Sequence, residues 1–219
     1  MNTTFQETVT IRLSDGVELS GELYLPKGAE SLVLFSHGSG SSRFSSRNNF
    51  VAQELHLQTI GTFLFDLLTI EEDQIYSNRF DIDLLAERLI QVTKFISAKK
   101  ECLDLSLGYF GASTGAASAF KVAALLPDLI QAVVSRGGRP DLAYPFCSRI
   151  KAPTLLIVGE LDQDVLKLNQ DVFKNLICPK KLEIVKQASH LFEEPGALKQ
   201  VSVMATNWFK KYLEYAVHV

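Results

Sequence analysis

The sequence has few cysteines and no long hydrophobic run, and these absences exclude several classes of protein. Only three of its 219 residues are cysteines, and no two of them have the spacing of a metal or redox motif. We therefore expect Cys102, Cys147 and Cys178 to be reduced thiols in a cytoplasmic protein. The longest apolar runs, such as TLLIVG at 154–159, are far too short to cross a bilayer. The first ten residues lack the basic start and apolar stretch of a secretory signal.

The sequence also lacks an excess of either charge. Its 22 basic and 25 acidic residues give a formal net charge of −3 at pH 7. This balance provides no positive surface to attract nucleic acid or an anionic membrane, so we expect neither as a partner. The acidic segment TIEEDQ at 69–74 is expected to be a solvated loop rather than a metal site, because no histidine or second carboxylate cluster accompanies it. No feature of the sequence indicates an oligomeric state.

The sequence does contain a regular alternation of strand-like and helix-like segments. Residues 8–25 alternate apolar and polar side chains on both sides of the turn SDG, as in a β-hairpin. Later apolar runs of strand length occur at 31–36, 61–68, 105–111, 131–135, 153–159 and 181–187. Segments of helical period occur at 47–58, 81–98, 114–126, 164–177 and 196–216.

This order predicts a single α/β domain over residues 1–219. Strands that alternate with helices form a mostly parallel, twisted sheet with helices on both faces, and the hairpin is expected to add an antiparallel edge. No linker, repeat or low-complexity tract divides the chain, and a hydrophobic content of 47% supports a large core. Ligands of such sheets bind at the carboxyl ends of the strands, so the residues directly after each apolar run are the candidates for function.

The pentapeptide GASTG at 111–115 joins the third parallel strand to a helix. A Gly-x-Ser-x-Gly sequence in this context indicates a nucleophile elbow, a sharp turn that lifts the serine hydroxyl above the sheet. The two glycines leave room for the neighbouring strand and helix. Ser113 is therefore the candidate nucleophile, and the alternative is a tight packing turn without a chemical role.

A serine nucleophile needs a base and an acid that orients the base. Only His190 and His218 follow Ser113 in the chain, and His190 comes directly after the last strand, whereas His218 is the penultimate residue. Asp162 and Asp164 both follow the strand at 153–159. Asp164 is better placed to cap the next helix, which favours Asp162 as the acid. The predicted triad is therefore Ser113, Asp162 and His190.

An oxyanion hole requires two backbone N–H groups near the nucleophile. One should come from Thr114, the residue after the nucleophile, and the other from the loop HGSGSS that begins at His37. In that loop Ser39 is the first choice of donor and Gly40 the second. We expect His37 to brace the loop rather than to act as the base.

The motifs HGSG, GASTG, GELDQDV and ASHLF, in this order, resemble the α/β-hydrolase fold. The short chain is similar to the dienelactone-hydrolase-like branch over residues 17–214, and the strings SRGGRPDLA and SHLFEEPGAL are similar to a bacterial subgroup of that family. Some members carry an attached phosphoribosyltransferase domain, for which we expect no room in 219 residues. Dienelactone hydrolases proper have a cysteine nucleophile, whereas position 113 is serine, which favours a general carboxylesterase over a lactone enzyme.

The predicted function is that of a serine hydrolase that needs no cofactor. It would cleave a small or medium ester, thioester or lactone through an acyl-enzyme. The segment 136–152 is too short for a large lid domain, which favours a soluble substrate over a lipid interface. Two alternatives are a non-catalytic binding protein with the same fold and an acyltransferase that uses an acceptor other than water.

Several arginines lie near the predicted rim of the site: Arg43, Arg47, Arg136 and Arg139. Arg136 directly follows a strand, and we expect it, and less surely Arg43, to bind a carboxylate or phosphate of the substrate. The alternative for Arg136 is an ion pair with Glu193 or Glu194, because a buried arginine normally needs a partner.

Overall fold

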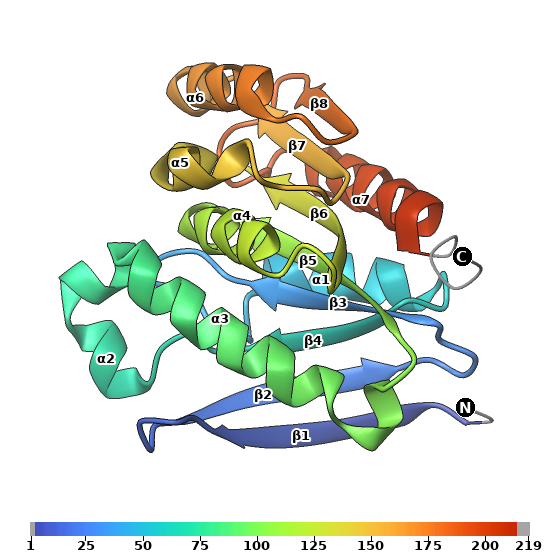
Figure 1. Ribbon diagram of the computed structural model, residues 1–219. Helices are drawn as coiled ribbons and strands as arrows, with labels where there is room; N and C mark the ends of the chain where they lie inside the picture. The colour runs from blue at the N-terminus through green and yellow to red at the C-terminus, as the bar shows by residue number, and fades with distance from the viewer. Residues whose placement is uncertain (1–2, 214–219) are drawn as a thin grey trace.

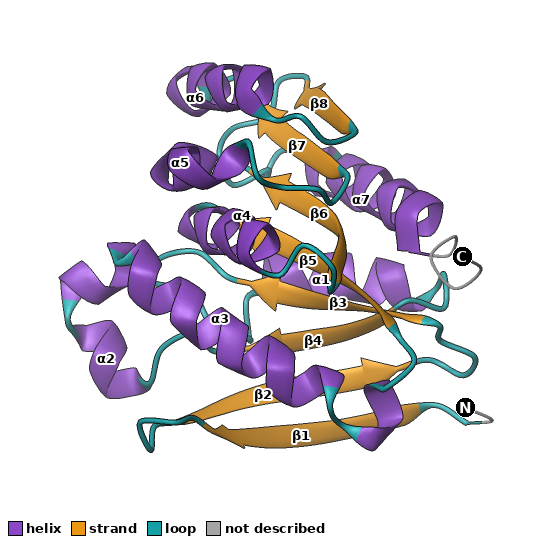
Figure 2. Ribbon diagram, in the orientation of Figure 1, coloured by secondary structure: helices purple, strands orange, loops and turns teal. Residues whose placement is uncertain are grey.

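The protein, described here by a computed structural model over residues 3–213, has one eight-stranded sheet (Figures 1 and 2). The strand order is β1-β2-β4-β3-β5-β6-β7-β8. The strands are β1 (Phe5–Arg12), β2 (Glu18–Leu25), β3 (Ser31–Ser36), β4 (Gly61–Phe65), β5 (Ser106–Ala112), β6 (Ile130–Arg136), β7 (Thr154–Gly159) and β8 (Lys180–Val185). β3 to β8 are parallel, whereas β2 pairs antiparallel with both β1 and β4. The predicted parallel sheet with an antiparallel edge is therefore confirmed.

Helices cover both faces of the sheet (Figure 1). One face carries α1 (Ser46–His56) and α7 (Ala197–Leu213), and the other carries α3 (Ile82–Ser97), α4 (Thr114–Leu125) and α6 (Gln163–Asn175). Two short helices, α2 (Ile70–Gln74) and α5 (Tyr144–Cys147), and 3₁₀ turns at Tyr76–Phe80, Lys100–Cys102 and Pro140–Ala143 lie in the connections. None of the helices described is long and apolar enough to cross a membrane.

The central strands and the helices form for different local reasons. All residues of β3, β4, β5 and β7 are buried, as expected of strands that are covered on both faces. α3 begins at an Asp81 cap, whose carboxylate accepts the N–H groups of Asp83 and Leu84. Its buried stripe, which includes Leu89 and Val92, then faces the sheet. Each such leucine or valine contributes about 2 kcal/mol through burial.

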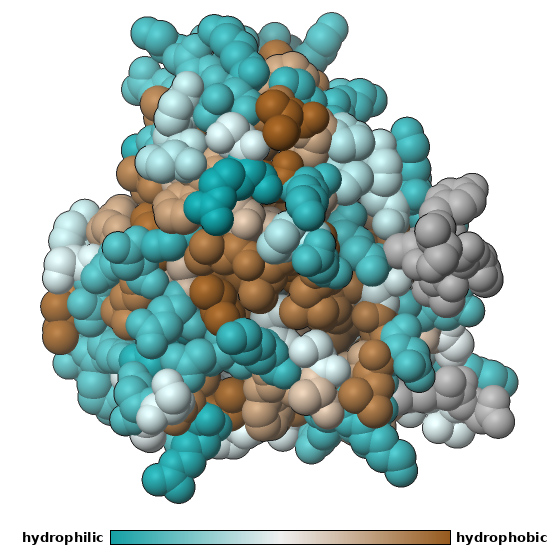
Figure 3. Space-filling view, in the orientation of Figure 1, coloured by the Kyte–Doolittle hydropathy of each residue, from teal (hydrophilic) through white to brown (hydrophobic). Residues whose placement is uncertain are grey.

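The core consists of two apolar clusters, one on each side of the sheet. In β6, Val133 belongs to the cluster beneath α3 and α4, whereas Ala132 and Val134 belong to the cluster beneath α1 and α7. Side chains of a strand alternate between the two faces of the sheet, so Arg136, two residues after Val134, faces the same side as Val134. The outer surface on the α3 side is mostly hydrophilic, with a hydrophobic area near its centre (Figure 3).

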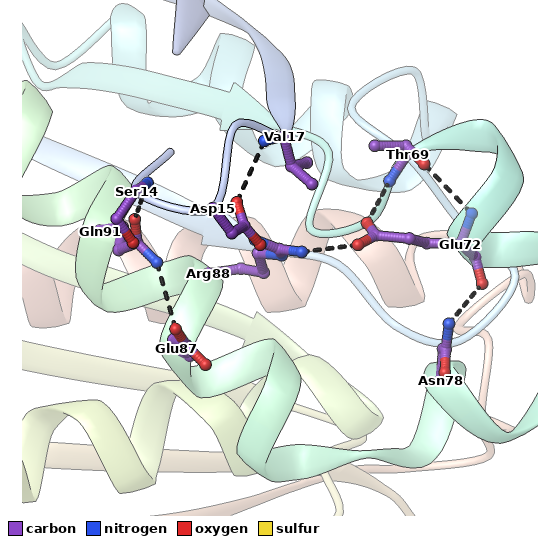
Figure 4. Close-up of polar contacts among 9 residues, drawn as sticks. All are labelled: Ser14, Asp15, Val17, Thr69, Glu72, Asn78, Glu87, Arg88 and Gln91. Atoms are coloured by element: carbon purple, nitrogen blue, oxygen red, sulfur yellow. Dashed lines mark hydrogen bonds and ion pairs between the residues drawn. The ribbon is translucent and has the colours of Figure 1, made fainter. Parts of the chain in front are cut away.

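The acidic segment 69–74 is a helix, so the expectation of a solvated loop is wrong. α2 begins with a capping box, in which the Thr69 hydroxyl accepts the Glu72 N–H and the Glu72 carboxylate accepts the Thr69 N–H. The same carboxylate binds Arg88 of α3 at 2.6 Å, and Arg88 also binds Asp15 in the β1–β2 turn at 2.6 Å (Figure 4). The Arg88 side chain is only 4% exposed. One buried arginine therefore joins the hairpin turn, α2 and α3.

The connection between β6 and β7 contains only a 3₁₀ turn and α5, in agreement with the predicted absence of a large lid. Cys147 in this connection, like Cys102 and Cys178, is a buried free thiol. Burial raises the pKa of Cys102 to about 11 and that of Cys147 to about 12, and it also raises the pKa of Cys178. All three thiols therefore stay protonated and poorly reactive at neutral pH.

Candidate active site

Ser113 lies in the sharp turn between β5 and α4, with a backbone conformation that side chains rarely adopt. Its φ and ψ angles are 51° and −122°, and a positive φ at a residue other than glycine is a strained conformation. The Ser113 N–H donates to the carbonyl of Arg136 at 3.3 Å, and its own carbonyl accepts the Arg139 N–H at 3.0 Å. These bonds to the end of β6 hold the strained turn in place, as expected of a nucleophile elbow.

The two glycines of the pentapeptide are required by close backbone approaches. A Cβ on Gly115 would lie 2.1 Å from the carbonyl oxygen of Ser36 and 2.4 Å from that of His37. A Cβ on Gly111 would lie 2.5 Å from the Cα of Ala116. All three distances are below any real Cβ contact, so only glycine lets α4 start this close to β3 and β5.

His190 and Asp162 meet at the same edge of the sheet. The Nδ1 atom of His190 lies 2.6 Å from Oδ2 of Asp162, a short bond that leaves Nε2 free. The Asp162 side chain is 15% exposed and that of His190 39% exposed, so the carboxylate is sheltered and the imidazole reaches the surface. Within residues 3–213 the Ser113 hydroxyl forms no hydrogen bond with His190, a contact that is often long in the absence of substrate.

The turn that carries His190 is held by backbone bonds. Phe192, which is buried and has a φ of 57°, donates its N–H to the carbonyl of Ser189. The Ser189 N–H in turn donates to the carboxylate of Glu194 at 3.0 Å. A Cβ on Gly137, the residue after β6, would lie 3.5 Å from Cε1 of His190. The imidazole therefore packs against the end of β6, the strand whose carbonyl also holds Ser113.

Asp162, rather than Asp164, contacts the histidine, but the capping argument that favoured it is wrong. α6 begins at Gln163, so Asp162 itself occupies the N-cap position and Asp164 lies in the first turn, exposed. The Asp162 side chain makes no capping bond because its carboxylate binds His190. The other candidate base, His218, lies outside the described residues.

The predicted oxyanion donors lie together, but one of them is already in use. Thr114 is the first residue of α4, so its N–H has no partner within the helix. The Ser39 N–H donates to the Thr114 hydroxyl at 2.9 Å rather than pointing to open space. The N–H of Gly40, the second choice of oxyanion donor, forms no hydrogen bond within the described part of the chain. Gly40 has a φ of +65°, which a glycine adopts easily.

His37 braces two loops and is not available as a base. Its Nε2 accepts the Leu67 N–H at 3.0 Å, so the ring proton is on Nδ1, which donates to the carbonyl of Gly38 at 3.0 Å. The side chain is buried, and burial lowers its pKa. The neutral ring ties the loop after β3 to the loop after β4, as expected from the sequence.

The two arginines expected to bind an anion differ in their surroundings. Arg43 forms ion pairs with Asp66 and, at 3.6 Å, with Glu22, so its charge is already balanced. Arg136 is buried, and neither Glu193 nor Glu194 pairs with it: Glu193 binds Arg47 at 3.2 Å, and Glu194 accepts the Ser189 N–H. The structure therefore favours Arg136 over Arg43 as an anion-binding residue.

A cavity of about 660 Å³ opens beside the loop that follows β3. This loop touches Ser113 at Gly38, where a Cβ would lie 3.0 Å from the serine Cβ, and then continues along the cavity wall. The other walls come from the start of β2, the loop after β4, and α2. α2, which sequence reasoning missed, thus forms one wall of this cavity. No group of three or more metal-ligating side chains is found within residues 3–213.

Comparisons with known proteins show the family and the fold, although no family model matches the chain. A dienelactone hydrolase from Anabaena variabilis, known from its crystal structure, is 48% identical, with a TM-score of 0.92 over 96% of this chain and 99% of that one. The esterase domain of a Rhodothermus marinus protein shares the fold at 19% identity, with a TM-score of 0.78 over 95% and 99% of the two chains.

Two curated proteins of Mycobacterium tuberculosis that carry the name phosphoribosyl transferase are 49% identical over 197 residues. The match covers 90% of this chain but 44% of theirs, so the chain spans less than half the length of these relatives. The match to the Anabaena enzyme, in contrast, covers nearly all of both proteins. On that similarity, the chain belongs to the dienelactone-hydrolase-like family of the α/β-hydrolases.

Proposed function

We propose that the protein is a serine hydrolase that cleaves a small or medium ester, thioester or lactone. The observation that supports this most strongly is the 2.6 Å contact between His190 and Asp162 at the edge of the sheet where Ser113 occupies a strained turn. A packing turn without a chemical role would not need a histidine bonded to a sheltered carboxylate at the same edge of the sheet. The names of the Anabaena and Rhodothermus proteins, a hydrolase and an esterase, are consistent with this proposal.

In the proposed mechanism, Nε2 of His190 takes the proton from the Ser113 hydroxyl as the oxygen attacks the carbonyl carbon. Asp162 accepts a hydrogen bond from Nδ1–H of His190, and this bond keeps the ring proton on Nδ1, so that Nε2 can accept the serine proton. The same carboxylate stabilises the imidazolium that then forms. The imidazolium then protonates the leaving alcohol or thiol. Water attacks the acyl-enzyme with His190 again as the base, and the acid product leaves.

The negative oxygen of each tetrahedral intermediate would be bound by the Thr114 N–H and one further backbone donor. The Ser39 N–H can serve only if the Thr114 hydroxyl, 2.9 Å away, rotates and releases it. The Gly40 N–H is the alternative donor. A helix N-terminus beside the nucleophile, at Thr114, adds a favourable electrostatic field.

Labelling with a fluorophosphonate probe tests this function directly. The purified protein should react at Ser113, and Ser113→Ala should abolish both the labelling and the hydrolysis of a panel of esters, thioesters and lactones. Ser148→Ala, at an exposed serine outside the site, is the matched control and should behave like the wild type. A folded wild-type protein that neither reacts with the probe nor cleaves any substrate would instead be a binding protein. Product analysis with added alcohols separates hydrolysis from acyl transfer.

A further inference from the structure

Arg136 is a buried arginine whose charge no carboxylate balances. The residue is 8% exposed, and its Nε and Nη1 atoms are enclosed without any hydrogen-bond partner in the described part of the chain. Its Nη2 atom also makes no hydrogen bond there but is not enclosed, so this nitrogen is the part of the guanidinium that a ligand could reach. A buried charge without a partner is strongly unfavourable, which calls for an explanation.

The neighbouring charges make an anion favourable at this position. Val134, two residues earlier in β6, faces α1 and α7, so Arg136 faces the same side. Burial lowers the pKa of Arg136 to about 10, and the positive charge of Arg47, in the first turn of α1, adds to this effect. The first turn of α1 contains no acidic residue. Arg47 is itself paired with Glu193 at 3.2 Å, so the uncompensated charge is that of Arg136, and the positive N-terminal end of α1 adds to it.

This arginine is also adjacent to the proposed catalytic groups. Arg136 pairs with Ala112, the residue before Ser113, and its carbonyl accepts the Ser113 N–H. The next residue, Gly137, packs against the imidazole of His190. Neighbouring strands are roughly 5 Å apart, so the backbone of Arg136 lies one strand spacing from the turn that holds Ser113, at the same edge of the sheet.

We propose that Arg136 binds a carboxylate or phosphate carried by the substrate, so that the enzyme prefers esters with a negative group a few bonds from the scissile carbonyl. This inference rests on the proposed hydrolase function and narrows its substrate class. The competing explanation is structural. The Oε2 atom of Glu194 is also buried and unpartnered, and a bridging water between it and Arg136 would balance the charge without any substrate.

Matched esters distinguish the two explanations. Monoethyl glutarate carries a carboxylate, ethyl pentanoate is its neutral counterpart, and ethyl 4-phosphonobutanoate replaces the carboxylate by a phosphonate. The wild type should cleave one of the anionic esters with a kcat/KM at least 10-fold above that of the neutral ester. Arg136→Met should lower that ratio about 10- to 100-fold, as expected for the loss of a charged hydrogen bond. Its activity on ethyl pentanoate should stay within about threefold of the wild type.

Arg139→Met is the matched control. Arg139 lies three residues further along the same rim, but its guanidinium is already bound to Asp141 by two hydrogen bonds. This variant should keep the wild-type ratio, and Arg136→Lys should keep part of it. An unchanged ratio in Arg136→Met, or an equal loss on all three esters together with a lower Tm, would overturn the proposal and indicate a structural arginine.

A binding measurement separates failure of this inference from failure of the hydrolase function. Glutarate and inorganic phosphate are tested as ligands by thermal shift, and at least one should raise the Tm of the wild type and of Arg139→Met but not that of Arg136→Met. If the wild type cleaves no ester, this shift still reports whether Arg136 binds an anion. If the anion binds but esters with and without the negative group are cleaved equally, the anion is a separate ligand and the substrate assignment is wrong.

Discussion

The close approach of α4 to β3 at Gly115 leads to a quantitative prediction. In Gly115→Ala the new Cβ would lie 2.1 Å from the carbonyl oxygen of Ser36, about 1.3 Å short of the 3.4 Å at which ordinary contact begins. β3 cannot yield, because it is hydrogen-bonded to β4 on one side and to β5 on the other. The start of α4 must therefore move outward by roughly 1 Å, and it takes Ser113 and Thr114 with it.

The displacement should affect both stability and activity. Overpacking of this kind costs about 3 kcal/mol, which for a chain of this length lowers the Tm by roughly 6–12 °C. A shift of about 1 Å in a catalytic group reduces the rate about 100-fold, so Gly115→Ala should lose at least that much of its kcat/KM on esters. Thermal unfolding and steady-state ester hydrolysis measure the two effects.

The control for this substitution is Gly16→Ala in the β1–β2 turn. Gly16, unlike Gly115, has a positive φ, +87°, but nothing lies within 4 Å of its Cβ position. The control should lose only about 1 kcal/mol through backbone strain and should keep its activity. If Gly115→Ala unfolds within 2 °C of the wild type, or hydrolyses esters at a similar rate, then the tightness of the elbow does not position Ser113 and the reasoning is refuted.

Two further predictions concern single side chains. Asp162→Asn should reduce kcat on esters about 1,000- to 10,000-fold by favouring the wrong tautomer of His190, whereas Asp164→Asn should not; comparable losses in both variants would mean that Asp162 is not the orienting acid. Burial lowers the pKa of His56 from 6.5 to about 4 in the folded protein. At pH values between these two numbers the folded protein therefore keeps His56 neutral, whereas the unfolded chain binds a proton there. Stability should therefore fall as the pH drops from 7.5 to 5, by about 1 kcal/mol more in the wild type than in His56→Gln after allowance for partial exposure. Denaturant unfolding at both pH values measures this difference, and parallel pH profiles would refute it.

The predictions from sequence succeeded where a local pattern was sufficient. The runs located every strand of the parallel sheet within a few residues. The inner strands β3, β4, β5 and β7 are apolar because they are covered on both faces, whereas β8 lies at the edge of the sheet and is only partly buried. The pentapeptide around Ser113 located the strained turn, since its glycines are required by contacts within the motif and with the adjacent strand. α2 was missed because its five residues are all exposed or half-buried and show no apolar period.

The sequence by itself determined the order of strands and helices and the order of the candidate nucleophile, acid and base. These depend on which residues follow one another, and so they can be recognised without knowing distances. Only the tertiary structure decided which of two aspartates contacts His190, that the Ser39 N–H is occupied by Thr114, and that Arg136 is buried without a partner. Such pairings depend on the separation of atoms that are far apart along the chain, and a difference of 1 or 2 Å decides whether a hydrogen bond or an ion pair forms.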